Sequence, residues 1–145
     1  MTALLSDPTM RLFAVCAAIL VLKMLVTANI TGILRTTHRH YATPEDFRFF
    51  GQEPVATRDE QIERVRRAHQ NDLENILPFL GIGFVYALTG PSYGVAWWLF
   101  VLFTLARILH TVTYLAGLQP WRTIAFGVGQ IALYVMAIAA LVRAL

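Results

Sequence analysis

Six polar side chains in two largely apolar segments are spaced so that each group of three would share one face of a helix. The first group follows an i, i+4, i+7 pattern and comprises Arg67, Asn71 and Glu74. The second follows an i, i+3, i+7 pattern and comprises Arg107, His110 and Tyr114. An α-helix turns by about 100° per residue, so both spacings return to the same side. Such faces could bind a small polyanion that also carries an amine, because guanidinium groups pair with carboxylates and Glu74 could accept an ammonium.

Two more arginines are expected at the same level of the molecule, Arg35 at the end of the first apolar segment and Arg122 at the start of the last. Charged residues inside membrane spans are rare and usually mark functional sites. The alternative is that these residues only pair with one another and hold helices together. Lys23 lies deep in the first apolar segment, and we expect a structural pair with Asp72 or Glu74 rather than a ligand contact.

The composition is that of a membrane protein. The sequence of 145 residues is 57% hydrophobic and only 14% charged, whereas soluble domains carry about 25% charged residues. The single cysteine, Cys16, excludes an intramolecular disulfide and a cysteine-based metal centre, so we expect no metal site. The net charge of +3 comes without a block of like charges, so we expect no nucleic-acid partner.

Apolar run lengths and turn signals predict an all-α, integral membrane four-helix bundle that forms a single domain over residues 1–145. The expected helices cover about 10–35, 59–89, 95–117 and 121–143. The apolar run Ile76–Leu88 is too short to span a bilayer alone, so its helix must begin in the charged segment, with Asp59 as N-cap. The first helix is expected to be retained rather than cleaved as a signal peptide, because Lys23 interrupts its apolar run.

Positive charge predicts the orientation in the membrane. The connection between the first two helices, with the start of the second, contains seven arginines: Arg35, Arg39, Arg48, Arg58, Arg64, Arg66 and Arg67. The short turn near Pro91 contains neither lysine nor arginine. The positive-inside rule therefore places the first loop and the polar cluster on the cytoplasmic side, with both termini on the other side.

Several motifs resemble one family of membrane enzymes. The segment Glu63–Phe79, ERVRRAHQNDLENILPF, resembles the second-helix motif of the membrane-associated proteins in eicosanoid and glutathione metabolism, the MAPEG family. The similarity continues through Leu80–Gly83, resumes at Ala106–Leu115 and includes Ala42–Asp46. Within the family, the sequence resembles the microsomal glutathione transferases more than the prostaglandin E synthases, which have an arginine in place of Gln70 and a tyrosine in place of Phe126.

The resemblance implies a homotrimer of four-helix bundles that binds glutathione near the cytoplasmic side, between subunits. The matching positions that would hold glutathione are Arg35, Arg67, Asn71, Glu74, Arg107, His110 and Tyr114. His69 belongs to the motif, although helical geometry points it away from Arg67. Arg122 would lie beside the thiol, where a nearby guanidinium favours the thiolate, and Thr123 could add a hydrogen bond to the sulfur. Asp46 matches an aspartate proposed to act in the synthase branch.

The function that follows from this resemblance is a membrane-bound glutathione transferase that activates the thiol for attack on lipophilic electrophiles. Glutathione peroxidase activity toward lipid hydroperoxides is an extension of the same chemistry. The first alternative is a glutathione-dependent prostaglandin-E-type isomerase, and the second is a non-catalytic membrane scaffold. The expected partners are further copies of the chain in a homotrimer, glutathione, a lipophilic substrate and membrane lipid.

Overall fold

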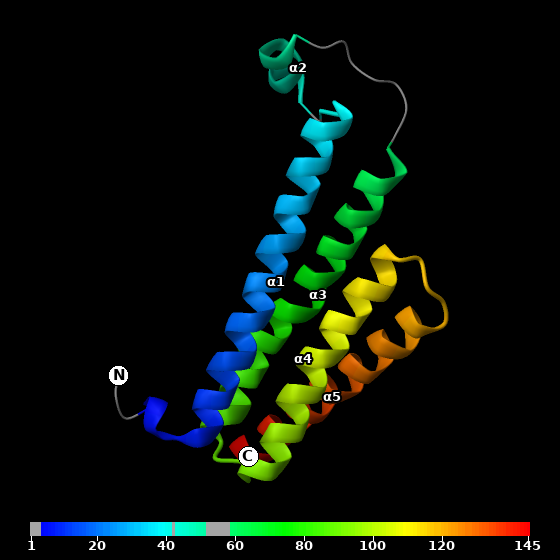
Figure 1. Cartoon of the computed structure of the whole chain (residues 1–145). Helices are drawn as coiled ribbons and strands as arrows, with labels where there is room; N and C mark the ends of the chain where they lie inside the picture. Colours follow the sequence, from blue (N-terminus) through cyan, green and yellow to red (C-terminus); the bar gives the residue numbers. More distant parts are fainter. Residues whose placement is uncertain (1–3, 42, 52–58) are drawn as a thin grey trace.

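The computed structural model describes residues 4–41, 43–51 and 59–145, and within these ranges the regular structure is entirely helical. A short 3-10 turn, η1 (Leu4–Ser6), precedes five α-helices (Figure 1). These are α1 (Pro8–His38), α2 (Pro44–Phe50), α3 (Glu60–Leu88), α4 (Tyr93–Leu115) and α5 (Trp121–Ala144). The four long helices begin and end within three residues of the positions expected from the sequence.

The start of α3 lies in the charged segment, as its short apolar run required. The Asp59 carboxylate caps the helix by accepting hydrogen bonds from the backbone N–H groups of Gln61 at 2.9 Å and Ile62 at 3.0 Å. The short helix α2 was not predicted. Its start nevertheless has ordinary helix signals, because Thr43 accepts from the backbone N–H of Asp46 at 3.4 Å and Pro44 occupies the first turn.

Helices α3 and α4 each contact all of the other long helices. Helix α3 contacts α1, α4 and α5, and α4 contacts both α1 and α5, whereas α1 and α5 do not contact each other in the described residues. Aromatic rings fill the core, with Phe79 of α3 stacked on Phe103 of α4 at a centroid distance of 4.4 Å. Figure 1 shows α1 and α3 extending past the α4–α5 turn toward α2, while the start of α1 and the end of α5 lie at the opposite end.

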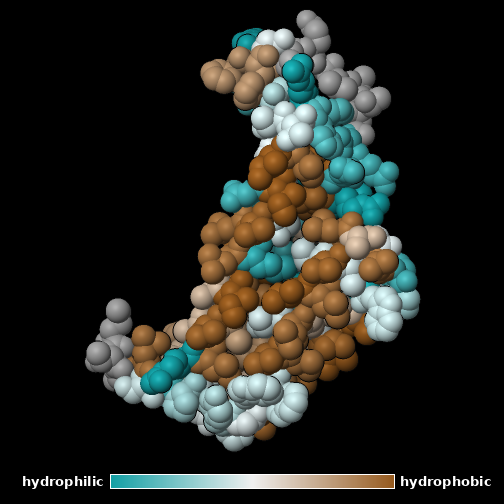
Figure 2. All heavy atoms as spheres, viewed as in Figure 1, coloured by the Kyte–Doolittle hydropathy of each residue, from teal (hydrophilic) through white to brown (hydrophobic). Residues whose placement is uncertain are grey.

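Three helices, α1, α4 and α5, are long and apolar enough to cross a membrane. Helix α3 does not meet that standard because charged residues fill its first turns. Figure 2 shows hydrophobic residues covering the body of the visible face, with hydrophilic residues gathered over the exposed end of α3. A smaller hydrophilic patch lies within the hydrophobic region of this face.

Candidate functional site

Asp72 of α3 is the centre of a buried polar network. Its Oδ1 accepts from Lys23 Nζ of α1 at 2.5 Å, from Thr111 Oγ1 of α4 at 3.3 Å and from Arg107 Nη2 of α4 at 3.4 Å. The side chains of Asp72 and Arg107 are 0% exposed, and that of Lys23 is 13% exposed. The predicted pairing of Lys23 is therefore confirmed with Asp72 and not with Glu74.

The network continues through amides to the last helix. Arg107 Nη2 also donates to Asn71 Oδ1 at 2.5 Å and lies 3.4 Å from His110 Nδ1. Asn75 Nδ2 donates to the Asn71 carbonyl at 2.7 Å, and Asn75 Oδ1 accepts from Gln130 Nε2 of α5 at 2.8 Å. Side chains from all four long helices are thus connected. Asn75 and Gln130 were missed from the sequence, because a single amide at the edge of one apolar run and another inside a second run were the only signals.

A second cluster lies where α4 ends and α5 begins. The guanidinium carbon of Arg122 lies 4.8 Å from the centroid of the Tyr114 ring, which is cation–π geometry. The Tyr114 ring in turn lies 5.6 Å from the His110 ring. Since His110 also lies beside Arg107, this cluster continues the buried network toward the end of the bundle. Three predicted site residues, Arg122, Tyr114 and His110, are therefore neighbours.

The amide of Gln119 connects the two residues predicted to act on a thiol. With its oxygen toward the guanidinium, Gln119 accepts from Arg122 Nη2 at 2.7 Å and from Arg122 Nε at 3.2 Å. Its nitrogen then donates to Thr123 Oγ1 at 3.0 Å. The opposite orientation would direct amide N–H groups at guanidinium N–H groups, where no acceptor exists. Gln119 was not predicted as a site residue, because a single glutamine in a turn carries no pattern.

The first predicted stripe is divided between a groove and the buried network. A groove of about 380 Å³ between α1 and α3 is lined by Ala28 and Thr31 on one side and by Arg67, His69 and Gln70 among others on the other. His69 was expected to point away from Arg67, yet both line this groove because it extends around the helix. Farther along α3, an exposed Glu74 accepts from Gln70 Nε2 at 3.1 Å.

Three predicted arginines have no carboxylate partner in the part of the chain that the structure describes. These are Arg35, Arg67 and Arg122. Their neighbours on α3 differ, since Arg64 pairs with Glu60 at 3.1 Å and Arg66 pairs with Glu63 at 2.7 Å. Charge at the polar end is therefore only partly neutralised, and guanidinium groups remain available for an anion.

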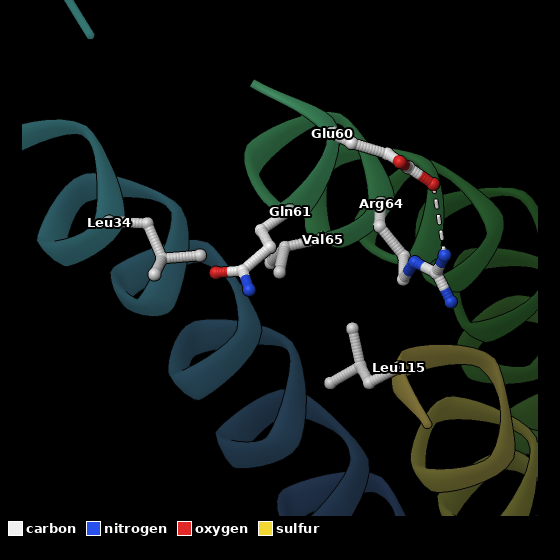
Figure 3. A pocket seen from close by; sticks show the side chains of 6 residues that line it. All are labelled: Leu34, Glu60, Gln61, Arg64, Val65 and Leu115. Atoms are coloured by element: carbon white, nitrogen blue, oxygen red, sulfur yellow. Dashed lines mark hydrogen bonds and ion pairs between the residues drawn. The ribbon is translucent and has the colours of Figure 1, made fainter. Parts of the chain in front are cut away.

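A pocket of about 420 Å³ opens at the same end, between α1, α3 and α4 (Figure 3). Its walls are apolar at Leu34, Val65 and Leu115, while Gln61 and the Arg64–Glu60 ion pair form the polar part. The Arg64 guanidinium also packs against the α4–α5 turn, where Gly117 has a φ of +70°. This contact fixes the start of α3 against the turn that precedes Arg122.

Arg35 and Asp46 are not brought to Arg122 within one chain. Arg35 is half-buried near the end of α1, and α1 does not contact α5 among the described residues. Asp46 lies on α2, which contacts none of the long helices in the described ranges. The remaining predicted residues lie in three places. The groove between α1 and α3 is lined by Arg67 and His69, with Glu74 hydrogen-bonded to Gln70 beside it. The buried network contains Asn71 and Arg107, and the junction of α4 and α5 holds His110, Tyr114, Arg122 and Thr123.

Comparison with known proteins shows the family of this chain. The model of the MAPEG family matches residues 13–142. The chain is 45% identical to microsomal glutathione S-transferase 1 of Homo sapiens over 134 residues, which cover 89% of this chain and 86% of that protein. It is 42% identical to prostaglandin E synthase of Macaca fascicularis over 128 residues, covering 88% and 84%. With three helices able to cross a bilayer, the chain is a membrane protein that belongs to the MAPEG family.

Proposed function

We propose that the protein is a membrane-bound glutathione transferase acting on lipophilic electrophiles. The observation that carries this proposal is the set of unneutralised groups at one end of an apolar bundle. Glutathione has two carboxylates, one ammonium and one thiol, and the three unpaired arginines together with the exposed Glu74 complement these charges. The names of relatives that are 45% identical over most of the chain support the same activity.

The proposed binding roles follow from exposure. Arg67 and Glu74 are exposed and can contact carboxylate and ammonium groups directly. Arg107 is enclosed, so in one chain it acts by holding Asn71 and by supporting His110 rather than through open contact. The full set assigned to glutathione is Arg35, Arg67, His69, Asn71, Glu74, Arg107, His110 and Tyr114.

Arg122 is proposed to stabilise the thiolate, with Thr123 as a second donor. A free thiol has a pKa of about 8.5, so little of it is ionised at neutral pH. A guanidinium within hydrogen-bond distance favours the anion, and the released proton passes to solvent. The sulfur then forms a bond to the electrophilic carbon as the bond to the leaving group breaks. The leaving group departs with the electron pair.

The lipophilic substrate is proposed to arrive from the membrane. A groove of about 440 Å³ on α4 and α5 is lined by apolar residues, including Leu109, Val112 and Ile124. Ile124 follows Arg122 and Thr123 within the first turn of α5. A hydrophobic molecule held in this groove would therefore be close to the proposed thiolate. Lipid hydroperoxides are proposed as further substrates, each consuming two molecules of glutathione to give an alcohol, water and glutathione disulfide.

A homotrimer is proposed because one chain leaves the site incomplete. Arg35 and Asp46 are separated from Arg122 in the single chain, since neither α1 nor α2 contacts α5 in its described part. A neighbouring copy could supply its own α1 to the Arg122 cluster. Native mass spectrometry in detergent tests this assembly, and an active strict monomer would contradict it.

A glutathione-dependent prostaglandin-E-type isomerase is the second candidate. It is favoured by the 42% identity to a prostaglandin E synthase over 88% of the chain. The same polar end would bind glutathione, and Asp46 would need to approach Arg122 from another copy. A scaffold without catalysis is the third candidate, and it predicts no turnover of glutathione with any electrophile.

The proposal is tested with purified protein in detergent, glutathione and a generic electrophile. Arg122→Leu should lower kcat and reduce the ultraviolet absorbance of bound thiolate, while glutathione affinity changes less. Arg122→Lys keeps the charge but loses the planar fork, so it should restore only part of the rate. Unchanged turnover and thiolate absorbance in Arg122→Leu would show that another residue activates the thiol, and Tyr114 is the next candidate.

The polar end is proposed to face the cytoplasm, following the positive charge of the first loop. In a Cys16→Ala background, single cysteines at Arg48 and Ser92 test the orientation with a reagent that cannot cross membranes. Intact cells should be labelled at Ser92→Cys only. Labelling at Arg48→Cys only would reverse the orientation.

A further inference from the structure

We infer that Gln119 is a positioning residue whose neutral amide holds both Arg122 and Thr123 in the state needed to receive a thiolate. The inference rests on the proposed function and extends it to a residue outside the predicted site. It begins from the hydrogen bonds that the Gln119 amide makes when its oxygen faces Arg122, the orientation that satisfies both groups: two are accepted from Arg122, at 2.7 and 3.2 Å, and one is donated to Thr123 at 3.0 Å.

The two bonds from Arg122 determine which part of its guanidinium remains unused. Nε and Nη2 donate to Gln119, and the guanidinium carbon lies over the Tyr114 ring, 4.8 Å from its centroid. Nη1 has no hydrogen-bond partner among the residues that the structure describes. An arginine has five N–H donors in a rigid planar fork. With one edge held by Gln119 and the guanidinium carbon over Tyr114, the Nη1 edge is left for an incoming anion.

The bond to Thr123 determines the direction of its hydroxyl proton. A threonine hydroxyl has one proton and two lone pairs. Because the Gln119 nitrogen donates, Oγ1 is the acceptor in this bond and its proton stays available. If the amide were reversed, the Thr123 hydroxyl would donate its proton to Gln119 Oε1 and could not donate to a ligand. The Gln119 amide therefore leaves two donors free on adjacent residues, the Nη1 edge of Arg122 and the hydroxyl of Thr123. Both can donate to the same anionic sulfur.

The neutrality of the amide matters as well as its geometry. A carboxylate at position 119 could accept from Arg122 equally well, but it would cancel the positive charge and could not donate to Thr123. The variant Gln119→Glu should therefore still hold Arg122 in place but fail to support activation of a thiol. Gln119→Met keeps the length of the side chain and removes all three hydrogen bonds.

The test measures kcat, KM for glutathione and the pH dependence of the rate. At pH 7, Gln119→Met should lower kcat by roughly two- to tenfold, the effect of losing net hydrogen bonds of ordinary strength, with a smaller change in KM. The defect should disappear at about pH 9.5, where a thiol with an ordinary pKa of about 8.5 ionises unaided. Gln119→Glu should show the same alkaline shift. In an Arg122→Leu background, Gln119→Met should cause less than about a twofold further loss because the two residues act together.

Gln61→Met is the matched control, since Gln61 lies on α3 and lines a different pocket, between α1, α3 and α4. The rate and pH profile of this variant should equal those of the unmodified protein. An unchanged profile in Gln119→Met, a defect that persists at all pH values, or full rescue by Gln119→Glu would each overturn the inference. Absence of glutathione turnover and thiolate absorbance in the unmodified protein would instead overturn the proposed function.

Discussion

Lys23 and Asp72 form an ion pair of 2.5 Å between α1 and α3, and Arg107 approaches the same carboxylate oxygen at 3.4 Å. One buried carboxylate therefore serves two cations from different helices. The second oxygen of Asp72 is buried and has no hydrogen-bond partner among the described residues. Asp72 is thus the residue on which the charge balance between α1, α3 and α4 depends.

Removal of Asp72 should destabilise the bundle more than removal of Lys23. Asp72→Asn leaves two buried cations unneutralised, a loss of roughly 3–5 kcal/mol, whereas Lys23→Met leaves Asp72 paired with Arg107. Thermal unfolding in detergent should give a lower Tm for Asp72→Asn than for Lys23→Met. The variant that carries both substitutions should lose less stability than the sum of the losses in the two single variants. If the two losses add strictly, Lys23 and Asp72 are not coupled.

The junction of α1 and α3 should weaken in acid. His38 Nδ1 lies 2.6 Å from Asp59 Oδ2, and the hydrogen bond from His38 lowers the pKa of Asp59 below its usual 3.8, helped by the N–H of Ile62. A carboxyl whose pKa is lower in the folded state contributes stability above its unfolded pKa, and this contribution is lost as the pH falls through the folded value. Protection of the first amides of α3 from hydrogen exchange should therefore decline below about pH 4.

Asp59→Asn provides the control for this acid effect. Asparagine is also a good N-cap, so the start of α3 should be retained, but it does not titrate. In Asp59→Asn, the first amides of α3 should be less protected from hydrogen exchange at neutral pH than in the unmodified protein. Their protection should not decline further near pH 4. The same acid decline in both proteins would assign the effect to another group.

A side chain at Gly117 should destabilise the protein. The φ of this residue, +70°, is left-handed, and an added Cβ would lie 2.8 Å from Arg64 Nη1. Gly117→Ala should lower the free energy of unfolding by about 1–2 kcal/mol from backbone strain alone, and displacing Arg64 should disturb the turn before Arg122. Gly81→Ala is the control, because Gly81 is helical with nothing near its added Cβ and should be neutral or slightly stabilising.

The sequence predicts the long helices well because run length and capping are local properties. The start of α3 is an example. Its first turns are too charged to form an apolar run, but Asp59 is a recognisable N-cap that marks where the helix begins. Helix α2 was missed because seven residues are too few to show a period, although Thr43 and Pro44 mark its start.

Which side chains meet across helices depends on packing, and the sequence restricts this only partly. It allowed Asp72 or Glu74 as the partner of Lys23, because both lie at a suitable depth. The structure selects Asp72, which is fully buried beside α4, while Glu74 is exposed. Gln119 could not be found in advance, since its role comes from a turn that brings its amide to Arg122.

Arg67 should act mainly in binding glutathione, because it is exposed and has no carboxylate partner in the described residues. Arg67→Leu should raise the Kd for glutathione by roughly 10- to 100-fold, the effect of losing a hydrogen bond to a charged group. The rate at saturating glutathione should change little, because the lost interaction is common to the ground and transition states. Isothermal titration and steady-state kinetics measure the two effects separately. Arg11→Leu is the control, because Arg11 lies in the first turn of α1, away from the polar end, and both values should stay unchanged. If Arg67→Leu instead lowers kcat without weakening the binding of glutathione, Arg67 acts at the reacting sulfur.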